Sequence, residues 1–124
     1  MLRNTFGVKE AIQKVGLSNC AISELTMFEL KVGAQITLQK DGINLDKKLS
    51  YLFDAVEIIP VTDAFDYAAK EKARLRLIGR PIGDDIDLLI GCSAVVNNMI
   101  MVTENIKHFE NISGIRIENW VKRK

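Results

Sequence analysis

The chain has 124 residues, of which 48% are hydrophobic and 27% are charged, and its formal net charge is +1. This balance predicts one globular domain over residues 1–124 and excludes disordered and fibrous classes. It also excludes a global basic field for nucleic acid, so such a contact has to come from a local patch. No apolar run reaches the ~18 residues that span a bilayer, and no signal-peptide pattern is present, which predicts a cytoplasmic protein without membrane contact.

Two cysteines, Cys20 and Cys92, lie in apolar runs, and the chain has a single histidine, His108. The cysteines are expected to be buried free thiols, as in a reducing compartment. No cysteine cluster forms a zinc motif, and one histidine excludes a multi-histidine metal centre.

Apolar residues recur at helical spacing in five segments, which alternate with short apolar runs typical of strands. Helices are expected at residues 6–16, 25–38, 45–53, from Thr62 to Gly79, and 84–97, and strands at 19–23, 56–61, 100–103 and 115–118. Asp41-Gly42 marks the break after the second helix. The alternation predicts an α/β sandwich with a mostly parallel sheet.

The helix in the middle of the chain follows a proline. Pro60 cannot donate to a sheet ladder, so the strand at 56–61 is expected to lie at an edge or to end there. Thr62 is a favoured N-cap residue, and Gly79 is expected to end the helix. The face expected to be buried carries Phe65, Ala69, Ala73 and Leu77.

The segment 84–97 is apolar nearly all round after its first turn, which predicts a buried helix. Asp84 and Asp85 are expected as caps, because aspartates satisfy free amides and offset the helix dipole. Asp87 lies one turn further in, where an unpaired acid costs roughly several kcal/mol. A paired or metal-bound role in a site is therefore the favoured interpretation of Asp87.

Glu29 has two interpretations. The phrase Thr26-Met27-Phe28-Glu29 matches a capping box, in which the glutamate only ties down a helix start. The other interpretation makes Glu29 an acid of a site, and spacing alone does not decide between them.

Thr103, Glu104 and Asn105 stand where the strand at 100–103 ends. In a parallel sheet that edge opens onto the ligand crevice, although Asn105 also suits a turn. Carboxylates gathered there suit a hard divalent cation, and a cation suits phosphodiester cleavage.

Basic residues near these acids are few. His108 is typical of a surface or cap histidine. Arg74, Arg76 and Arg80 suggest a basic rim, with a solvated helix face as the alternative.

Four phrases in order resemble the PIN-domain family, and within it the VapC-type toxins of bacterial toxin–antitoxin pairs. The phrases are AISELTMFELKVGA (21–34), GRPIGDDIDLLIGCSAV (79–95), MVTENIKHF (101–109) and IRIENW (115–120). The order and spacing match from about Asn19 to Trp120.

The resemblance implies a three-layer sandwich and a Mg²⁺- or Mn²⁺-dependent ribonuclease that acts on RNA, pairs with an antitoxin protein and forms a homodimer. By position, Glu29 resembles the second acid of the family's quartet, Asp87 the third, and Asn105 occupies the fourth place. Asp85 and Glu104 are neighbours expected to ligate or tune the metal. For substrate binding, we expect Thr103, Arg80 and His108 to contribute.

The chain departs from the family at its start. The family opens with a central strand ending in Asp-Thr-Asn, which supplies the first metal ligand, and nothing before Asn19 resembles it. We expect a fold without that strand and a weakened metal site. If so, strand edges are left unpaired, which favours self-association through Met27, Phe28 and the first two helices.

Two other functions remain open at this point. One is a non-catalytic PIN remnant that binds an antitoxin or itself, which the missing ligand supports. The other is a phosphoacceptor receiver domain, which is also α/β with clustered acids. The receiver is the weaker alternative, because its paired acids follow its first strand, whereas Asp84 and Asp85 open a late helix.

Overall fold

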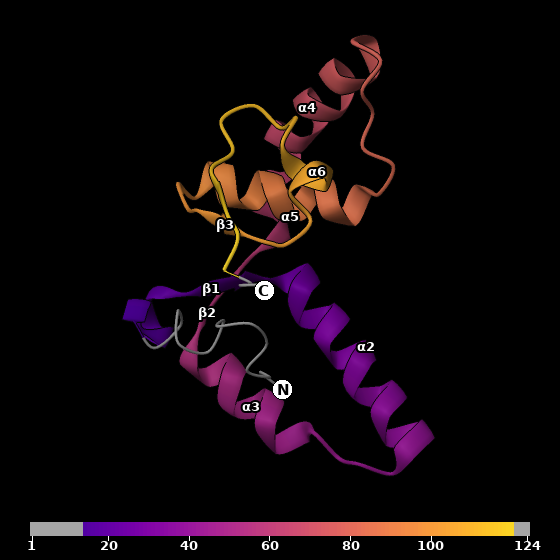
Figure 1. The fold of residues 1–124 in the computed structure, drawn as a ribbon, viewed down its shortest axis with the longest axis vertical. Helices are drawn as coiled ribbons and strands as arrows, with labels where there is room; N and C mark the ends of the chain where they lie inside the picture. Colours follow the sequence, from indigo (N-terminus) through magenta and orange to yellow (C-terminus); the bar gives the residue numbers. More distant parts are fainter. Residues whose placement is uncertain (1–13, 121–124) are drawn as a thin grey trace. The chain divides into compact units, whose positions relative to one another are not determined.

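A computed structural model describes residues 14–120 of the chain (Figure 1). The helix predicted at 6–16 and the departure at the N-terminus therefore lie almost entirely outside the described residues. The chain divides into two compact units, Met1–Ile59 and Pro60–Lys124. Each unit contains one pair of parallel strands. No helix in the described part of the chain is long and apolar enough to cross a membrane.

In its described residues, 14–59, the N-terminal unit has two long helices and a pair of short strands. Its elements are η1 (Leu17–Asn19), β1 (Ala21–Ser23), α2 (Glu24–Asp41), α3 (Asp46–Ala55) and β2 (Glu57–Ile59). Strands β1 and β2 pair in parallel with Ile22 opposite Ile58. The buried side chains of the two helices and of the β2 segment form its core: Ala34, Leu49, Leu52, Val56 and Ile59.

Local sequence sets the ends of α2. The Ser23 hydroxyl accepts a hydrogen bond from the Leu25 amide at 3.0 Å, which satisfies one free donor of the first turn. Gly42 adopts a left-handed conformation with φ 71°, and its amide donates to Leu38 O at 2.9 Å. Glycine takes this conformation without steric cost, so the predicted break at Asp41-Gly42 is confirmed. Strand β2 ends before Pro60, also as predicted.

The C-terminal unit is mainly helical. Its elements are η2 (Val61–Ala64), α4 (Phe65–Leu77), α5 (Asp85–Val96), β3 (Met101–Val102), α6 (Ile106–Phe109) and β4 (Ile117–Glu118). Strands β3 and β4 pair in parallel with Met101 opposite Ile117. The buried core of this unit joins α4, α5 and the segment after α6, and it contains Ala64, Ala68, Leu75, Leu88, Cys92, Phe109 and Ile112.

Two predictions about α4 are wrong. Thr62 does not cap the helix, because Val61–Ala64 forms a short 3-10 turn and the cap position falls on Ala64. The predicted buried face is also incorrect, since Phe65 is 49% and Leu77 is 86% exposed. The buried stripe is Ala64, Ala68, Glu71 and Leu75. Alanines occur on both faces of the helix, and the face that is buried also carries the acid Glu71. Apolar periodicity therefore predicted the wrong face.

All strand pairings are parallel, as expected, but the described residues do not form one sheet. The strands pair as two separate two-stranded sheets, β1 with β2 and β3 with β4. Within residues 14–120 no strand pairs with both β1 and β3. The resemblance to the family implies a further strand between the segments of β1 and β3.

Candidate active site

The three aspartates at the start of α5 have different environments. Asp84 is the N-cap, and its Oδ1 accepts a hydrogen bond from the Ile86 amide at 2.8 Å. Asp85 is exposed and forms an ion pair with Lys72 of α4, with Nζ and Oδ1 2.8 Å apart. The capping prediction is therefore confirmed for Asp84, while Asp85 connects α5 to α4.

Asp87 has a partner from a different element. Its side chain is only 24% exposed, and its Oδ2 lies 3.3 Å from Nδ1 of His108 on α6. An imidazole at this distance donates a hydrogen bond or, when protonated, supplies the opposite charge. This contact offsets the cost of holding a carboxylate away from water. Asp87 is thus paired with the chain's single histidine, while its role in a site stays a prediction.

The turn between β3 and α6 presents Asn105. The Thr103 hydroxyl accepts a hydrogen bond from the Asn105 amide at 3.0 Å, and Asn105 O accepts from the His108 amide at 3.0 Å. Asn105 stands at the N-cap position, but its side chain makes no capping hydrogen bond and is exposed. The neighbouring Glu104 is also exposed. The amide oxygen of Asn105 is therefore not used in holding the turn.

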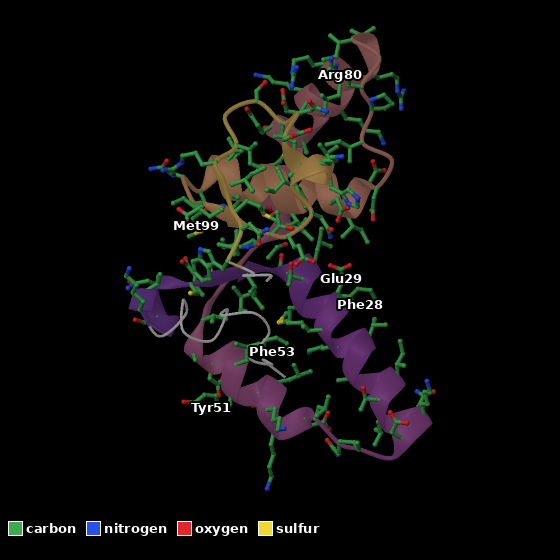
Figure 2. The ribbon with its side chains drawn as sticks, viewed as in Figure 1. Phe28, Glu29, Tyr51, Phe53, Arg80 and Met99 are labelled. Carbon is green, nitrogen blue, oxygen red and sulfur yellow. The ribbon has the colours of Figure 1, made fainter. Side chains whose placement is uncertain are left out.

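Glu29 lies in the second turn of α2 and is exposed (Figure 2). The capping-box interpretation is wrong, because α2 begins at Glu24 with Ser23 as its cap and Thr26 lies inside the helix. Glu29 therefore has no role at the helix start. Its convergence with Asp87 and Asn105 stays a prediction, since they belong to different units.

The three arginines predicted to form a basic rim differ in their environments. Arg76 and Arg80 are exposed. The Arg80 amide donates to Leu75 O at 2.8 Å across the turn made by Gly79, whose φ is 75°. Arg74 does not belong to a basic rim, because its guanidinium is engaged by the carboxylate of Glu71.

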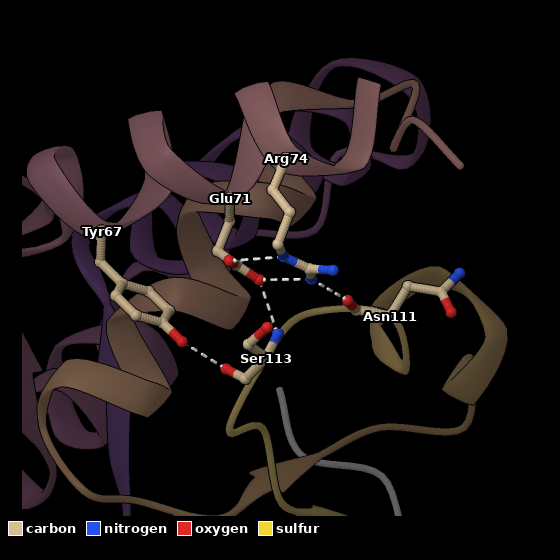
Figure 3. Close-up of polar contacts among 5 residues, drawn as sticks. All are labelled: Tyr67, Glu71, Arg74, Asn111 and Ser113. Carbon is tan, nitrogen blue, oxygen red and sulfur yellow. Dashed lines mark hydrogen bonds and ion pairs between the residues drawn. The ribbon is translucent and has the colours of Figure 1, made fainter. Parts of the chain in front are cut away.

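Glu71 was not among the residues predicted from sequence, yet it is only 4% exposed. Its carboxylate accepts two hydrogen bonds from Arg74, at 2.8 and 3.0 Å, and one from the Ser113 amide at 2.6 Å (Figure 3). The Arg74 hydrogen bonds are the main cause that lowers the pKa of Glu71; burial opposes them and the Ser113 amide adds to them. Its helical position could have indicated that it is buried, because Glu71 shares a helix face with Ala68 and Leu75.

The oxygen donors suit a hard cation. Mg²⁺ takes one or two carboxylates and keeps several waters, so the carboxylate of Asp87 and the exposed amide of Asn105 are donors of the kind it binds. Asp85 is less suitable, because Lys72 engages both of its carboxylate oxygens, whereas His108 contacts only Oδ2 of Asp87. Among residues 14–120, no three histidine, cysteine, aspartate or glutamate side chains are grouped to hold a metal ion.

The chain is similar in sequence to proteins that are named as VapC nucleases. The chain is 33% identical over 103 residues to Ribonuclease VapC2 of Rickettsia felis, covering 82% of this chain and 75% of that protein. It is 33% identical over 104 residues to the tRNA(fMet)-specific endonuclease VapC of Salmonella typhimurium, covering 83% and 76%.

Among solved structures, DNA-bound VapBC from Salmonella typhimurium matches with a TM-score of 0.78 and 30% identity over 92% of this chain and 84% of that one. No family model matches the chain. Similarity of sequence and fold over more than four fifths of the chain nevertheless shows that the chain belongs to the VapC toxin family of PIN-domain proteins.

Proposed function

We propose that the chain is a metal-dependent endoribonuclease, the toxin of a toxin–antitoxin pair. The observation that carries the proposal is the half-buried carboxylate of Asp87, paired with His108 at 3.3 Å in the unit that also presents Asn105. Carboxylates that ligate a metal are usually held in place by a hydrogen-bond partner, as His108 holds Asp87. The relatives named as a ribonuclease and as a tRNA(fMet)-specific endonuclease support the same activity.

Each site residue has a proposed role. Asp87, Glu29 and Asn105 would hold Mg²⁺ or Mn²⁺, and Asp85 and Glu104 would tune its charge. A divalent cation held by these residues would supply a more acidic bound water and positive charge opposite the phosphate. Thr103 shapes the turn that presents Asn105. His108 holds the Asp87 carboxylate in one orientation through the contact between its Nδ1 and Oδ2.

RNA is the proposed substrate. Cleavage at a defined phosphate needs access to the backbone, which favours a single strand or a splayed loop. Arg80 and Arg76 are exposed and offer the local positive charge that the overall balance of +1 lacks. Phosphate contacts of this type position the strand without reading its sequence.

The proposed protein partners are an antitoxin and a second copy of the chain. The solved neighbours are VapBC assemblies, which supports the antitoxin. On α2, Phe28, Val32 and Ile36 follow each other at four-residue spacing and are 60%, 41% and 58% exposed. Residues at this spacing share one helix face, so they form an apolar stripe suited to a partner. Sedimentation of the wild type and Phe28→Ser at tens of micromolar tests self-association, with a clean wild-type monomer as the contrary result.

Cleavage of single-stranded RNA by the purified chain, with tRNA(fMet) as one probe, tests the activity. We expect Mg²⁺-dependent cleavage that chelation abolishes and that Asp87→Asn lowers by about 100-fold. Asp66→Asn is the matched control, because Asp66 is an exposed acid in the first turn of α4. If Asp87→Asn cleaves as well as its parent, or if no RNA is cut, the chain is instead a non-catalytic antitoxin-binding protein.

A further inference from the structure

Helix α6 carries His108 but is too short to hold its own position. It spans four residues, Ile106–Phe109, and one turn of helix is not stable alone in water. At its start the turn made by Thr103 and Asn105 holds it. At its end the chain continues into residues 110–114, so the position of His108 depends on what anchors that loop.

Three side chains of α4 anchor the loop (Figure 3). Glu71 accepts from the Ser113 amide at 2.6 Å, and the Tyr67 hydroxyl donates to Ser113 O at 2.5 Å. The Arg74 guanidinium donates to Asn111 O at 2.7 Å. Two residues of the loop, Asn111 and Ser113, are therefore attached to one face of α4.

Glu71 links the contacts that Arg74 and Ser113 make at this loop. One guanidinium nitrogen of Arg74 bonds both to the Glu71 carboxylate and to Asn111 O, so the carboxylate orients the group that binds the loop. The lowered pKa of Glu71, caused mainly by Arg74, keeps it ionised at neutral pH. Removing its charge leaves Arg74 without a counter-ion and weakens two of the three attachments.

Phe109, at the end of α6, and Ile112, between the two attached residues, pack onto α5. Ile112 is 2% exposed and Phe109 is 5% exposed. Both pack against Gly91, where an added β-carbon would lie 2.6 Å from Ile112 Cδ1 and 3.1 Å from Phe109 Cδ1. Asp87 is four residues before Gly91, which places both on the same face of α5. His108 is adjacent to Phe109, so the seating of Phe109 at Gly91 sets how His108 meets Asp87.

We infer that Glu71 is a positioning residue for the Asp87–His108 pair, acting through Arg74, the 111–113 loop and α6. This inference rests on the proposed function for its catalytic consequence, but its structural part does not. Glu71 itself contacts neither substrate nor metal in this account. Its effect is to fix the geometry in which His108 holds the Asp87 carboxylate.

The imidazole signals of His108 in NMR spectra test this directly, because it is the chain's only histidine and needs no metal or RNA to be observed. At one fixed pH we expect Glu71→Gln to move these signals toward those of Asp87→Asn, in which the pair is lost. Arg74→Gln should do the same, and the double variant should be no worse than either single one, because both act through one attachment.

Arg116→Gln is the matched control. Arg116 donates hydrogen bonds to O and Oδ1 of Asn98 at 3.0 and 3.1 Å. Its replacement therefore removes two arginine hydrogen bonds in the C-terminal unit, neither of which involves the 111–113 loop. Its His108 signals should coincide with those of the wild type. If Glu71→Gln does not fold, Tyr67→Phe removes only the bond to Ser113 O, and a smaller shift in the same direction is expected.

The inference is overturned if folded Glu71→Gln shows the same His108 signals as the wild type. If Glu71→Gln does not fold, the same result in Tyr67→Phe overturns it. Either outcome holds whatever the variant does to activity. In the cleavage assay, Glu71→Gln should lower kcat by about tenfold with KM changed less than about twofold, since a misplaced group costs rate more than binding. If the wild type cuts no RNA, the proposed function fails, while the His108 signals still decide the role of Glu71.

Discussion

Gly91 and Ile112 approach so closely that a β-carbon at position 91 would lie 2.6 Å from Ile112 Cδ1. The Phe109 ring closes the same space at 3.1 Å, and Ile112 has little room to move because it is 2% exposed. This contact brings α5 against the segment that follows α6. The absence of a side chain at position 91 is therefore a packing requirement of the C-terminal unit.

Gly91→Ala should lower the free energy of unfolding by about 1–3 kcal/mol, because overpacking outweighs the gain in helix propensity. Gly33→Ala is its control, since nothing lies within 4 Å of a β-carbon built at that position of α2. That variant should be more stable by about 1 kcal/mol. Urea denaturation measures both, and equal gains at the two sites would contradict the packing argument.

The stability contribution of Glu71 should depend on pH. Its pKa in the folded protein is lowered, chiefly by Arg74, so the unfolded chain binds the proton first as pH falls. The contribution is full above the ordinary glutamate value of about 4.3 and is lost as pH falls through the folded pKa.

Glu71→Gln should therefore be less stable than the wild type by about 1–3 kcal/mol at pH 7, with a smaller difference at pH 3. Denaturant unfolding at the two pH values measures the difference. A gap that is the same at both pH values would show that charge on Glu71 does not contribute.

Asp84 and Asp87 should separate stability from activity. Asp84 caps α5, so Asp84→Ala should cost about 1 kcal/mol, while Asp84→Asn keeps an acceptor and costs only a few tenths. Asp87→Asn should change stability little but lower cleavage by about 100-fold. Unfolding and cleavage measured on the same preparations test this, and retained activity in Asp87→Asn would refute its role in the site.

The cysteines should differ in reactivity. Burial raises the pKa of Cys92 to about 12, and its side chain is 0% exposed, so the thiolate needed for alkylation does not form at pH 8. Cys20 is less buried, although burial also raises its pKa. Iodoacetamide should modify Cys20 slowly and Cys92 only after denaturation in urea, as mass spectrometry can show.

Helix ends were largely predictable, because they depend on contacts within a few residues. Asp84, Gly42 and Pro60 act as their residue types predict. The start of α2 was expected at residue 25 and lies at Glu24, but the capping-box interpretation was wrong, because Ser23 and not Thr26 caps the helix. Serine and threonine are both suitable cap residues, so spacing alone did not decide between them, although the expected strand at 19–23 does end at Ser23.

The buried face of α4 was not predictable from periodicity. Alanines stand on both candidate faces, and the buried one carries Glu71, an acid that apolar patterns count as exposed. Its burial becomes favourable only with Arg74 and the Ser113 amide in place. The Ser113 amide is 42 residues away in sequence, so no local signal contains it.

The sequence by itself determined the family phrases, most of the helices and strands, and the special position of Asp87 one turn into an apolar helix. Only the tertiary structure decided that His108, 21 residues further on, is the partner of Asp87. It also decided that the strands pair two by two. The physical reason is range: turns, caps and periodicity act between near neighbours, whereas the pairing of distant residues depends on how the helices pack.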